Sequence, residues 1–182
     1  MINKGLREQD FKLGCLHGKL NAEDEKSEAQ IQRTVFLSQR IRICRKKDVK
    51  PVIRIFGYEV PLGYNRGRCV DLMGYDEDHN IYIIELKKKE SKEKMEKVVE
   101  QINDYEKSVE KILLHIEKEF EEAYFFPVQF KNIKKMIIAP REFYEGKKPL
   151  PNDTGIEYGY FRDKDINKRK PKDIINIHLQ KK

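Results

Sequence analysis

The segment from residue 91 to residue 124 carries a long apolar stripe with the spacing of an α-helix. Apolar side chains recur there at steps of three and four residues, which places them on one helix face. They are Met95, Val98, Val99, Ile102, Tyr105, Val109, Ile112, Leu113, Ile116 and Phe120. A β-strand pattern precedes the segment and another follows it at residues 133–139. We therefore expect the helix to be a crossover between parallel strands of one sheet.

Residues 68–87, directly before this helix, have the pattern of a β-hairpin. Two runs rich in β-branched and aromatic side chains flank a polar turn at residues 76–80. A hairpin centred on this turn places Asp71 directly opposite Glu85, where the Cβ atoms of paired residues lie about 4.5–5.5 Å apart. Side chains alternate along a strand, so Lys87 lies on the same face as Glu85. The hairpin thus brings two acids and a lysine together among apolar residues.

The remaining patterns predict a mixture of helix and strand. We expect a helix over residues 23–39, a strand over residues 52–60, and two late strands over residues 156–161 and 174–179. Residues 41–44 either end the first helix or begin an extended segment. This order of elements predicts an α/β architecture, a mixed β-sheet flanked by helices.

Net charge favours an anionic partner. The chain of 182 residues has a formal net charge of +7, and a basic chain of this kind favours nucleic acid first. Seven basic residues lie from Arg40 to Arg54, against a single acid, Asp48. The alternative interpretation of any one charged run is a solvated surface.

Cysteine usage and the absence of long apolar runs indicate the compartment. The three cysteines are widely spaced, which fits reduced thiols better than a set of disulfides. No apolar run is long enough to span a membrane, and the first residues lack the apolar core of a signal peptide. We therefore expect a cytoplasmic protein with no membrane partner.

The acidic hairpin predicts a site for a divalent cation. Mg²⁺ is usually held by one or two carboxylates, with water and substrate phosphate completing its shell. Asp71 and Glu85 supply the carboxylates, and the Leu86 carbonyl is a candidate third ligand. Bound Mg²⁺ or Mn²⁺ can acidify a water and neutralise a scissile phosphate, and the Lys87 ammonium can stabilise the charge that develops. The alternative is a solvated hairpin face on which Lys87 simply pairs with an acid.

These residues resemble the motif of the PD-(D/E)xK nuclease superfamily, which has the restriction-endonuclease-like fold. Asp71 matches the aspartate of that motif, and Glu85-Leu86-Lys87 matches its second half. The proline that precedes the aspartate in the family is Val70 here, at a position that varies among family members. The resemblance implies a Mg²⁺- or Mn²⁺-dependent deoxyribonuclease that acts in DNA repair, recombination or defence.

A Gln-x-x-x-Tyr pair in the following helix adds to the resemblance. Gln101 and Tyr105 share a helix face, and RecB-type and lambda-exonuclease-type nuclease domains carry such a pair beside the active site. The resemblance, which spans residues 23–140, implies that this pair supports catalysis and that Glu28 is a further metal ligand. The alternatives are a tyrosine at the core edge with a surface glutamine, and an ordinary surface glutamate.

We expect one nuclease-like domain over residues 1–182, in which residues 141–182 form a basic C-terminal strand extension. Arg66, Arg68 and Lys88 are expected to hold the DNA backbone. A nuclease-like nucleic-acid-binding module without catalysis, or a subunit of a larger defence complex, remains the alternative. The sequence leaves open endonuclease or exonuclease action, the type of strand, and a homodimer or a partner subunit.

Overall fold

Strands dominate the part of the chain that this computed structural model describes. The described residues are 28–44, 51–63, 69–147, 155–162, 166 and 174–180. The elements in chain order are α1 (Glu28–Ser38), β1 (Arg40–Cys44), β2 (Val52–Pro61), β3 (Cys69–Tyr75), β4 (Ile81–Leu86), α2 (Met95–Tyr124), β5 (Ile133–Pro140), the 3-10 helix η1 (Arg141–Tyr144), β6 (Ile156–Phe161) and β7 (Ile175–Leu179).

The seven described strands form one closed barrel in which each strand neighbours the next along the chain. The pairs β1–β2, β2–β3, β3–β4 and β6–β7 are antiparallel, whereas β4–β5 and β5–β6 are parallel. A further parallel pair, β1 with β7, closes the barrel and sets Ile43 opposite Ile177.

The prediction of an α/β restriction-endonuclease-like sheet flanked by helices is therefore wrong. β7 pairs with β1 as well as with β6, so the described strands close on themselves, and two α-helices accompany them in the described residues. Residues 41–44 decide between the two architectures. The sequence pattern left open whether they end the first helix or form an extended segment, and in the structure they belong to β1. Its contacts with β7 include Cys44 and Asn176, which are 132 positions apart, and such distant pairing leaves no local pattern in the sequence.

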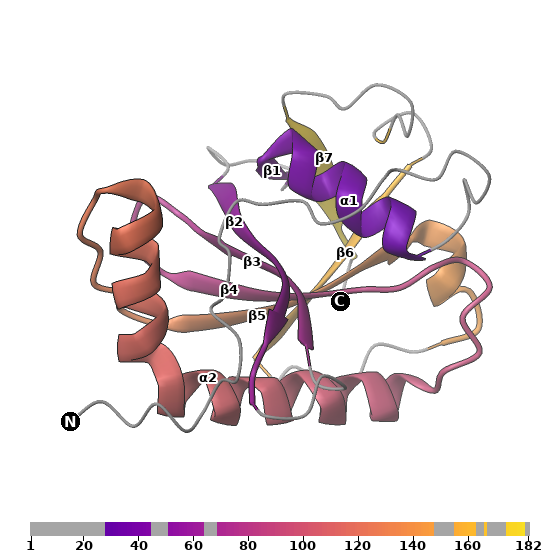
Figure 1. The fold of residues 1–182 in the computed structure, drawn as a ribbon. Coiled ribbons are helices and arrows are strands. Elements are labelled where there is room, and N and C mark those ends of the chain that lie inside the picture. The colour runs from indigo at the N-terminus through magenta and orange to yellow at the C-terminus, as the bar shows by residue number, and fades with distance from the viewer. Residues whose placement is uncertain are drawn as a thin grey trace.

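Two clusters of buried side chains occupy the two faces of the barrel wall. All seven strands contribute to the inner cluster, which also contains Ile31, Val35 and Phe36 of α1. Because every strand takes part, this cluster fills the inside of the barrel, with α1 packed against it. The outer cluster joins α2 to the outer faces of β2 to β6. Figure 1 shows α1 and α2 on opposite sides of the strands.

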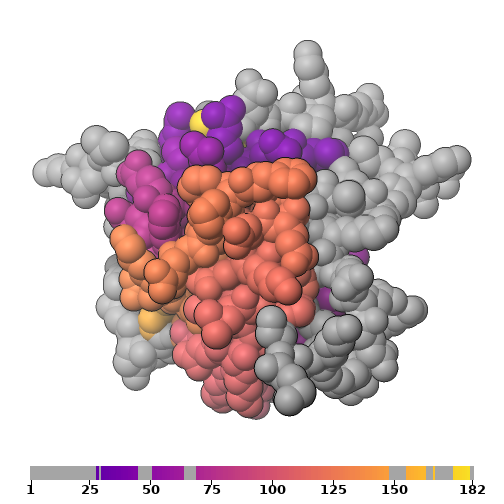
Figure 2. Space-filling model, turned by 60° about the vertical axis from the view of Figure 1, so that its left-hand side comes forward, coloured from indigo at the N-terminus to yellow at the C-terminus, as the bar shows by residue number. Residues whose placement is uncertain are grey.

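The helix α2 follows the predicted apolar stripe and begins at Met95 rather than at residue 91. Nine of its side chains are buried, all of them members of that stripe, and each large apolar side chain contributes about 1.5–3 kcal/mol when fully buried. As predicted, it connects two parallel strands, β4 and β5. The salmon and orange residues of α2 and of the segment after it cover the middle of the face shown in Figure 2. Neither α-helix of the described residues combines the length and the apolar character needed to cross a membrane.

The hairpin of β3 and β4 has the predicted register. Leu72 pairs with Ile84 and Tyr75 pairs with Ile81, and the same register continued by one step sets Asp71 opposite Glu85. The register of such a hairpin is set by its turn and by its buried face.

The turn between β3 and β4 is held by one buried acid. Oδ1 of Asp76 accepts hydrogen bonds from the N–H groups of Asp78, at 3.1 Å, and Asn80, at 2.9 Å. Its Oδ2 accepts a further bond of 3.0 Å from the Tyr82 hydroxyl. A turn fixed in this way holds the two strands in the register that brings the acids together at their other end.

Candidate metal centre

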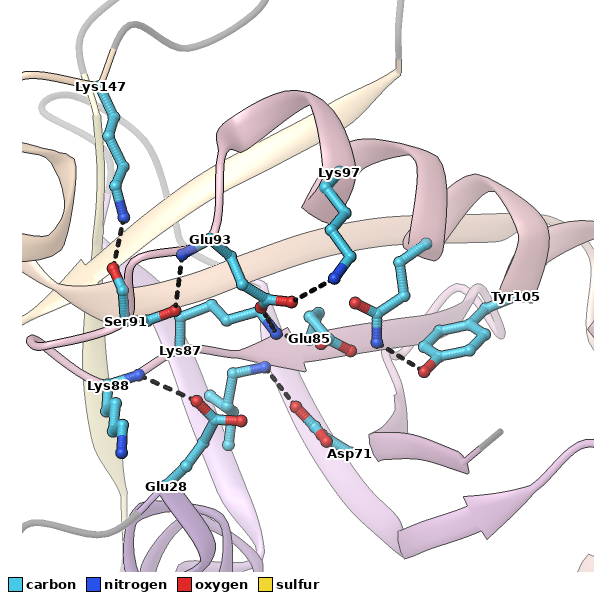
Figure 3. Close-up of polar contacts among 12 residues, drawn as sticks. Glu28, Asp71, Glu85, Lys87, Lys88, Ser91, Glu93, Lys97, Tyr105 and Lys147 are labelled. Carbon is cyan, nitrogen blue, oxygen red and sulfur yellow. Dashed lines mark hydrogen bonds and ion pairs between the residues drawn. The ribbon is translucent and has the colours of Figure 1, made fainter. Parts of the chain in front are cut away.

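Charged side chains from separate elements converge at one end of β3 and β4. Asp71 lies in β3, Glu85 lies in β4, and Lys87 follows β4 directly. Figure 3 shows these side chains close together, with Glu28 approaching from α1 and Tyr105 from α2. The structure thus gathers the residues that carry the chemistry predicted from the sequence.

The site lies on the outer face of the barrel wall, the face that α2 covers. Met73 and Ile83 belong to the outer cluster, and alternation along the strands places Asp71 and Glu85 on the same face. Only 2% of Glu85 and 5% of Lys87 is exposed. Charges buried this deeply need compensating charges or hydrogen bonds.

A backbone donor fixes the Asp71 carboxylate. Its Oδ2 atom accepts a hydrogen bond of 2.7 Å from the Leu86 N–H. Leu86 lies two residues past Ile84, and Ile84 and Leu72 are the last residues of the two strands that pair. Burial raises the pKa of the Asp71 carboxyl well above its ordinary value, and the Glu85 carboxylate raises it further, whereas the bond from Leu86 lowers it. The two carboxylates are therefore close enough to repel each other.

Glu85 and Lys87 form a buried ion pair. Lys87 Nζ lies 2.8 Å from Glu85 Oε1 and 2.7 Å from Glu93 Oε2. Burial lowers the pKa of Lys87, but the two carboxylates outweigh burial and raise that pKa above its ordinary value. Burial also raises the pKa of Glu85, and the Lys87 ammonium offsets this only in part. The site thus holds more negative charge than the Lys87 ammonium neutralises.

The second carboxylate oxygen of Glu85 fits a cation. Among the described residues, Glu85 Oε2 is buried and has no hydrogen-bond partner, although buried polar atoms are normally bonded. The acid opposite it, Asp71, offers a second carboxyl group. Carboxylate oxygens of this kind match hard divalent cations such as Mg²⁺ and Mn²⁺. The donors present therefore fit the ion that the sequence predicts.

Two carboxylates, rather than a full cage of side chains, would hold this ion. Within the described residues, no group of three or more His, Cys, Asp or Glu side chains is arranged to hold a metal. Mg²⁺ keeps several waters and uses one or two carboxylates together with substrate phosphate, so two acids suffice for it. The Leu86 carbonyl as a third ligand stays a prediction.

Gln101 and Tyr105 lie on the face of α2 that borders the acids. The Gln101 side-chain amide donates a 2.7 Å hydrogen bond to the Tyr105 hydroxyl oxygen. Burial raises the pKa of that hydroxyl, the Gln101 bond lowers it, and the charges of Glu85 and Asp71 raise it further. Tyr105 therefore keeps its proton beside two carboxylates. The supporting role of the pair in catalysis stays a prediction.

Glu28 reaches the edge of the site from the first turn of α1. One of its carboxylate oxygens, Oε2, accepts a hydrogen bond of 3.2 Å from the Lys88 N–H. Burial is the largest cause that raises the pKa values of Asp71 and Glu85, and the charge of Glu28 also raises both. Glu28 is thus close enough to influence a bound cation, and its role as a ligand stays a prediction.

The structure does not describe the two arginines that are expected to hold DNA. Arg66 and Arg68 lie outside the described residues. In the basic run from Arg40 to Arg54, the described arginines are exposed on β1 and β2. Arg54 pairs with Tyr75, the last residue of β3, whereas the acid of the site stands near the start of that strand. This part of the run therefore lies toward the other end of the sheet.

A lysine-rich segment borders the site more closely. Residues 87–97 lead from the end of β4 into the first turn of α2. Its exposed lysines are Lys88, Lys89, Lys92, Lys94 and Lys97. Because the segment begins at the buried ammonium of Lys87, it is the described stretch best placed to meet an anionic chain at the carboxylates.

Glu93 and Lys147 are site residues that sequence reasoning missed. Glu93 holds the Lys87 ammonium, and Lys147 donates a hydrogen bond of 2.7 Å to the carbonyl oxygen of Ser91. Glu93 left one usable signal: a buried lysine needs several acceptors, and Glu93 is the second acid after Lys87 in the chain. Lys147 left none, because it reaches the site from beyond β5.

Comparison of the chain with protein-family models, with curated proteins and with solved structures finds no match.

Proposed function

We propose that this protein is a metal-dependent nuclease that hydrolyses phosphodiester bonds in DNA with Mg²⁺ or Mn²⁺. The observation that carries the proposal is the buried Glu85 Oε2, which lacks a partner among the described residues. The Glu85 carboxylate also lies close enough to a second acid, Asp71, to raise its pKa. Beside it lies a buried ammonium. Acids left unbalanced in this way lower stability, so their presence is best explained by a bound cation and an anionic substrate.

The bound ion would supply a nucleophilic water and would neutralise charge on the scissile phosphate. Asp71 and Glu85 hold it, with the Asp71 carboxylate oriented by the Leu86 N–H. The Lys87 ammonium, which lies 2.8 Å from Glu85 Oε1, would stabilise the extra negative charge of the pentavalent transition state. Tyr105 keeps its proton and can donate it in a hydrogen bond to a phosphate oxygen.

The substrate backbone would run along the lysine-rich segment 87–97. Contacts between exposed lysines and phosphates release counterions, so affinity falls with salt, and each contact contributes about 0.7–0.9 to the slope of log affinity against log salt. The sequence has no helix-turn-helix or zinc-finger pattern that would read bases, and we infer low sequence specificity.

The test is degradation of plasmid, linear duplex and single-stranded DNA with Mg²⁺, with Mn²⁺ and with EDTA. We expect cleavage with either metal and none with EDTA. Asp71→Asn keeps an acceptor for Leu86 but removes a charged ligand, and Lys87→Met keeps the apolar stem but removes the ammonium. Each should lower kcat by about 10²–10³-fold, the effect of removing one stabilising group.

Lys89→Ala is the matched control, because this exposed lysine lies two positions from Lys87 and does not touch the carboxylates. It should keep kcat and weaken only DNA binding. Undiminished cleavage by both the Asp71→Asn and the Lys87→Met proteins would rule out this site. Metal-independent DNA binding without any cleavage would favour the binding-module alternative.

A further inference from the structure

Glu93 stands outside the hairpin motif but contacts the same ammonium. Its Oε2 atom lies 2.7 Å from Lys87 Nζ, and its Oε1 atom lies 3.5 Å from Lys97 Nζ. Its side chain is only one-third exposed, whereas that of Lys97 is largely exposed. Glu93 thus links the buried ammonium to the exposed lysine segment, as Figure 3 shows.

The Lys87 ammonium has donors for more than one acceptor. An ammonium has three N–H donors, and the carboxylates of Glu85 and Glu93 take two of them at 2.8 and 2.7 Å. Only Oε1 of Glu85 is engaged, which leaves its Oε2 for a cation. Glu93 shares the ammonium, so Lys87 is held from two sides and need not bind both oxygens of Glu85.

Two hydrogen bonds, one within the segment and one from Lys147, hold the backbone that carries Glu93. The Glu93 N–H donates to Ser91 Oγ at 3.5 Å, and the Ser91 carbonyl accepts the bond from Lys147. The Lys147 ammonium also lies 3.6 Å from the centre of the Phe143 ring, and Phe143 is buried in the outer cluster. Contacts from η1 and its C-terminal flank thus set the position of an acid on the segment before α2.

We propose that Glu93 is a positioning residue for the reaction: it holds the Lys87 ammonium beside the scissile phosphate and leaves Glu85 Oε2 free to bind the metal. The inference rests on the proposed nuclease function. It assigns to the segment between β4 and α2 a part in catalysis that the Asp, Glu and Lys of the hairpin do not supply. An acid on each side then fixes the orientation of the Lys87 ammonium, which would otherwise rotate freely.

The first test follows the Lys87 ammonium directly and needs no cleavage. Lysine ammonium groups that are held by carboxylates give resolved ¹H–¹⁵N NMR signals, and the Lys87→Arg variant assigns the signal by its loss. In the metal-free protein we expect a Lys87 signal that Glu93→Gln broadens or abolishes. Glu96→Gln removes the same charge from an exposed acid three positions away and should leave the signal unchanged.

The second test separates positioning from binding and from folding. Glu93→Gln should lower kcat at least 10-fold and change KM less than 3-fold, while Glu96→Gln keeps kcat. The shift in melting temperature on adding Mn²⁺ should persist in Glu93→Gln, because the two metal-binding acids are intact. Glu93→Asp keeps the charge but is one methylene shorter, and it should recover less than half of the lost kcat.

The outcomes distinguish the two proposals. An unchanged Lys87 signal, or wild-type kcat, in the Glu93→Gln protein would overturn the positioning role while leaving the nuclease proposal intact. A wild-type protein that neither binds Mn²⁺ nor cleaves DNA would overturn the nuclease proposal, and the catalytic role of Glu93 with it. Loss of the Lys87 signal in the Glu93→Gln protein together with a 10-fold loss of kcat supports both.

Discussion

At the scale of single residues, the site combines one rigid acid with one incompletely satisfied acid. The hydrogen bond from the Leu86 N–H holds the Asp71 carboxylate in one orientation. Glu85 gives one oxygen to Lys87 and, among the described residues, keeps the other without a partner. The charges that make such a site useful also lower the stability of the metal-free protein.

Replacing the rigid acid should therefore stabilise the metal-free protein. Asp71→Asn keeps the acceptor for the Leu86 N–H and removes the repulsion with Glu85. We expect a higher melting temperature than wild type at neutral pH in EDTA, and a lost response to Mn²⁺. Differential scanning calorimetry checks both. A lower melting temperature in EDTA would show that the charge of Asp71 is compensated by groups other than a cation.

The pH dependence of the metal-free protein follows from the same residue. The pKa of Asp71 is raised by burial above its ordinary value of 3.8, so the folded protein holds this proton at pH values where the unfolded chain has lost it. This contribution to stability is complete below about pH 4 and is lost as pH rises through the folded pKa. The difference in the free energy of unfolding between wild type and Asp71→Asn should therefore grow from pH 4 towards neutral pH, as measured by urea unfolding in EDTA.

At the scale of elements, local patterns predicted the hairpin and the long helix well. The stripe from Met95 to Phe120 needs only a period of three to four residues, and the polar turn fixes the register of β3 and β4. The late strands β6 and β7 also occur close to their predicted positions. Each of these features depends on residues near one another in the chain. Glu93 was missed because it joins the site through a contact with the Lys87 ammonium, and no periodic pattern in the sequence marks such a contact.

The end of α2 carries a strain that the sequence does not reveal. Phe125 follows the last residue of the helix with a φ of 54°, in the left-handed region, and its N–H donates to the Glu121 carbonyl. Glycine is the usual residue at this position because it has no Cβ. The Phe125 side chain is 93% exposed, so burial of its ring does not offset the strain.

Phe125→Gly should therefore stabilise the protein by about 1 kcal/mol, the typical cost of a left-handed conformation for a residue with a side chain. For a chain of this size that corresponds to about 2–4 °C in melting temperature. Phe126→Gly is the control: Phe126 is 52% exposed and does not have a positive φ, so it should be neutral or destabilising. Equal effects of the two changes would argue against a left-handed Phe125.

At the scale of the whole molecule, one distant strand pair decides the architecture. The sequence predicted a sheet with a C-terminal extension, and the structure has a barrel because β7 pairs with β1. A parallel neighbour leaves no distinct pattern in the sequence of either strand, since each strand has only five residues and its isoleucines alternate with polar side chains. The global closure could not be predicted from residues 41–44 or 174–179 taken separately.

A cross-link tests the closure. Cys44 pairs with His178 across β1 and β7, and neighbouring strands lie about 4.7–4.9 Å apart, within the range of Cα separations that disulfides accept. With Cys15 and Cys69 replaced by serine, we expect His178→Cys to form an intramolecular disulfide with Cys44 under mild oxidation, detected by mass spectrometry of a digest.

Leu179→Cys is the matched control for this cross-link. Leu179 is one position farther along β7, so its side chain points to the opposite face, where it packs against the inner cluster. It should not cross-link with Cys44. An open sheet in which β1 and β7 lie apart would give no disulfide with either variant.

Because β1 pairs with β7, β1 is synthesised on the ribosome well before the strand that closes the barrel with it. Cys44 in β1 and Asn176 in β7 are 132 positions apart, and translation adds about 5–20 residues per second, so β1 waits on the order of ten seconds for its partner. Throughout that delay Ile41 and Ile43 remain without the neighbour that later shields them. The nascent chain therefore carries an unpaired apolar strand edge, which is the kind of surface that chaperones bind and that neighbouring chains capture.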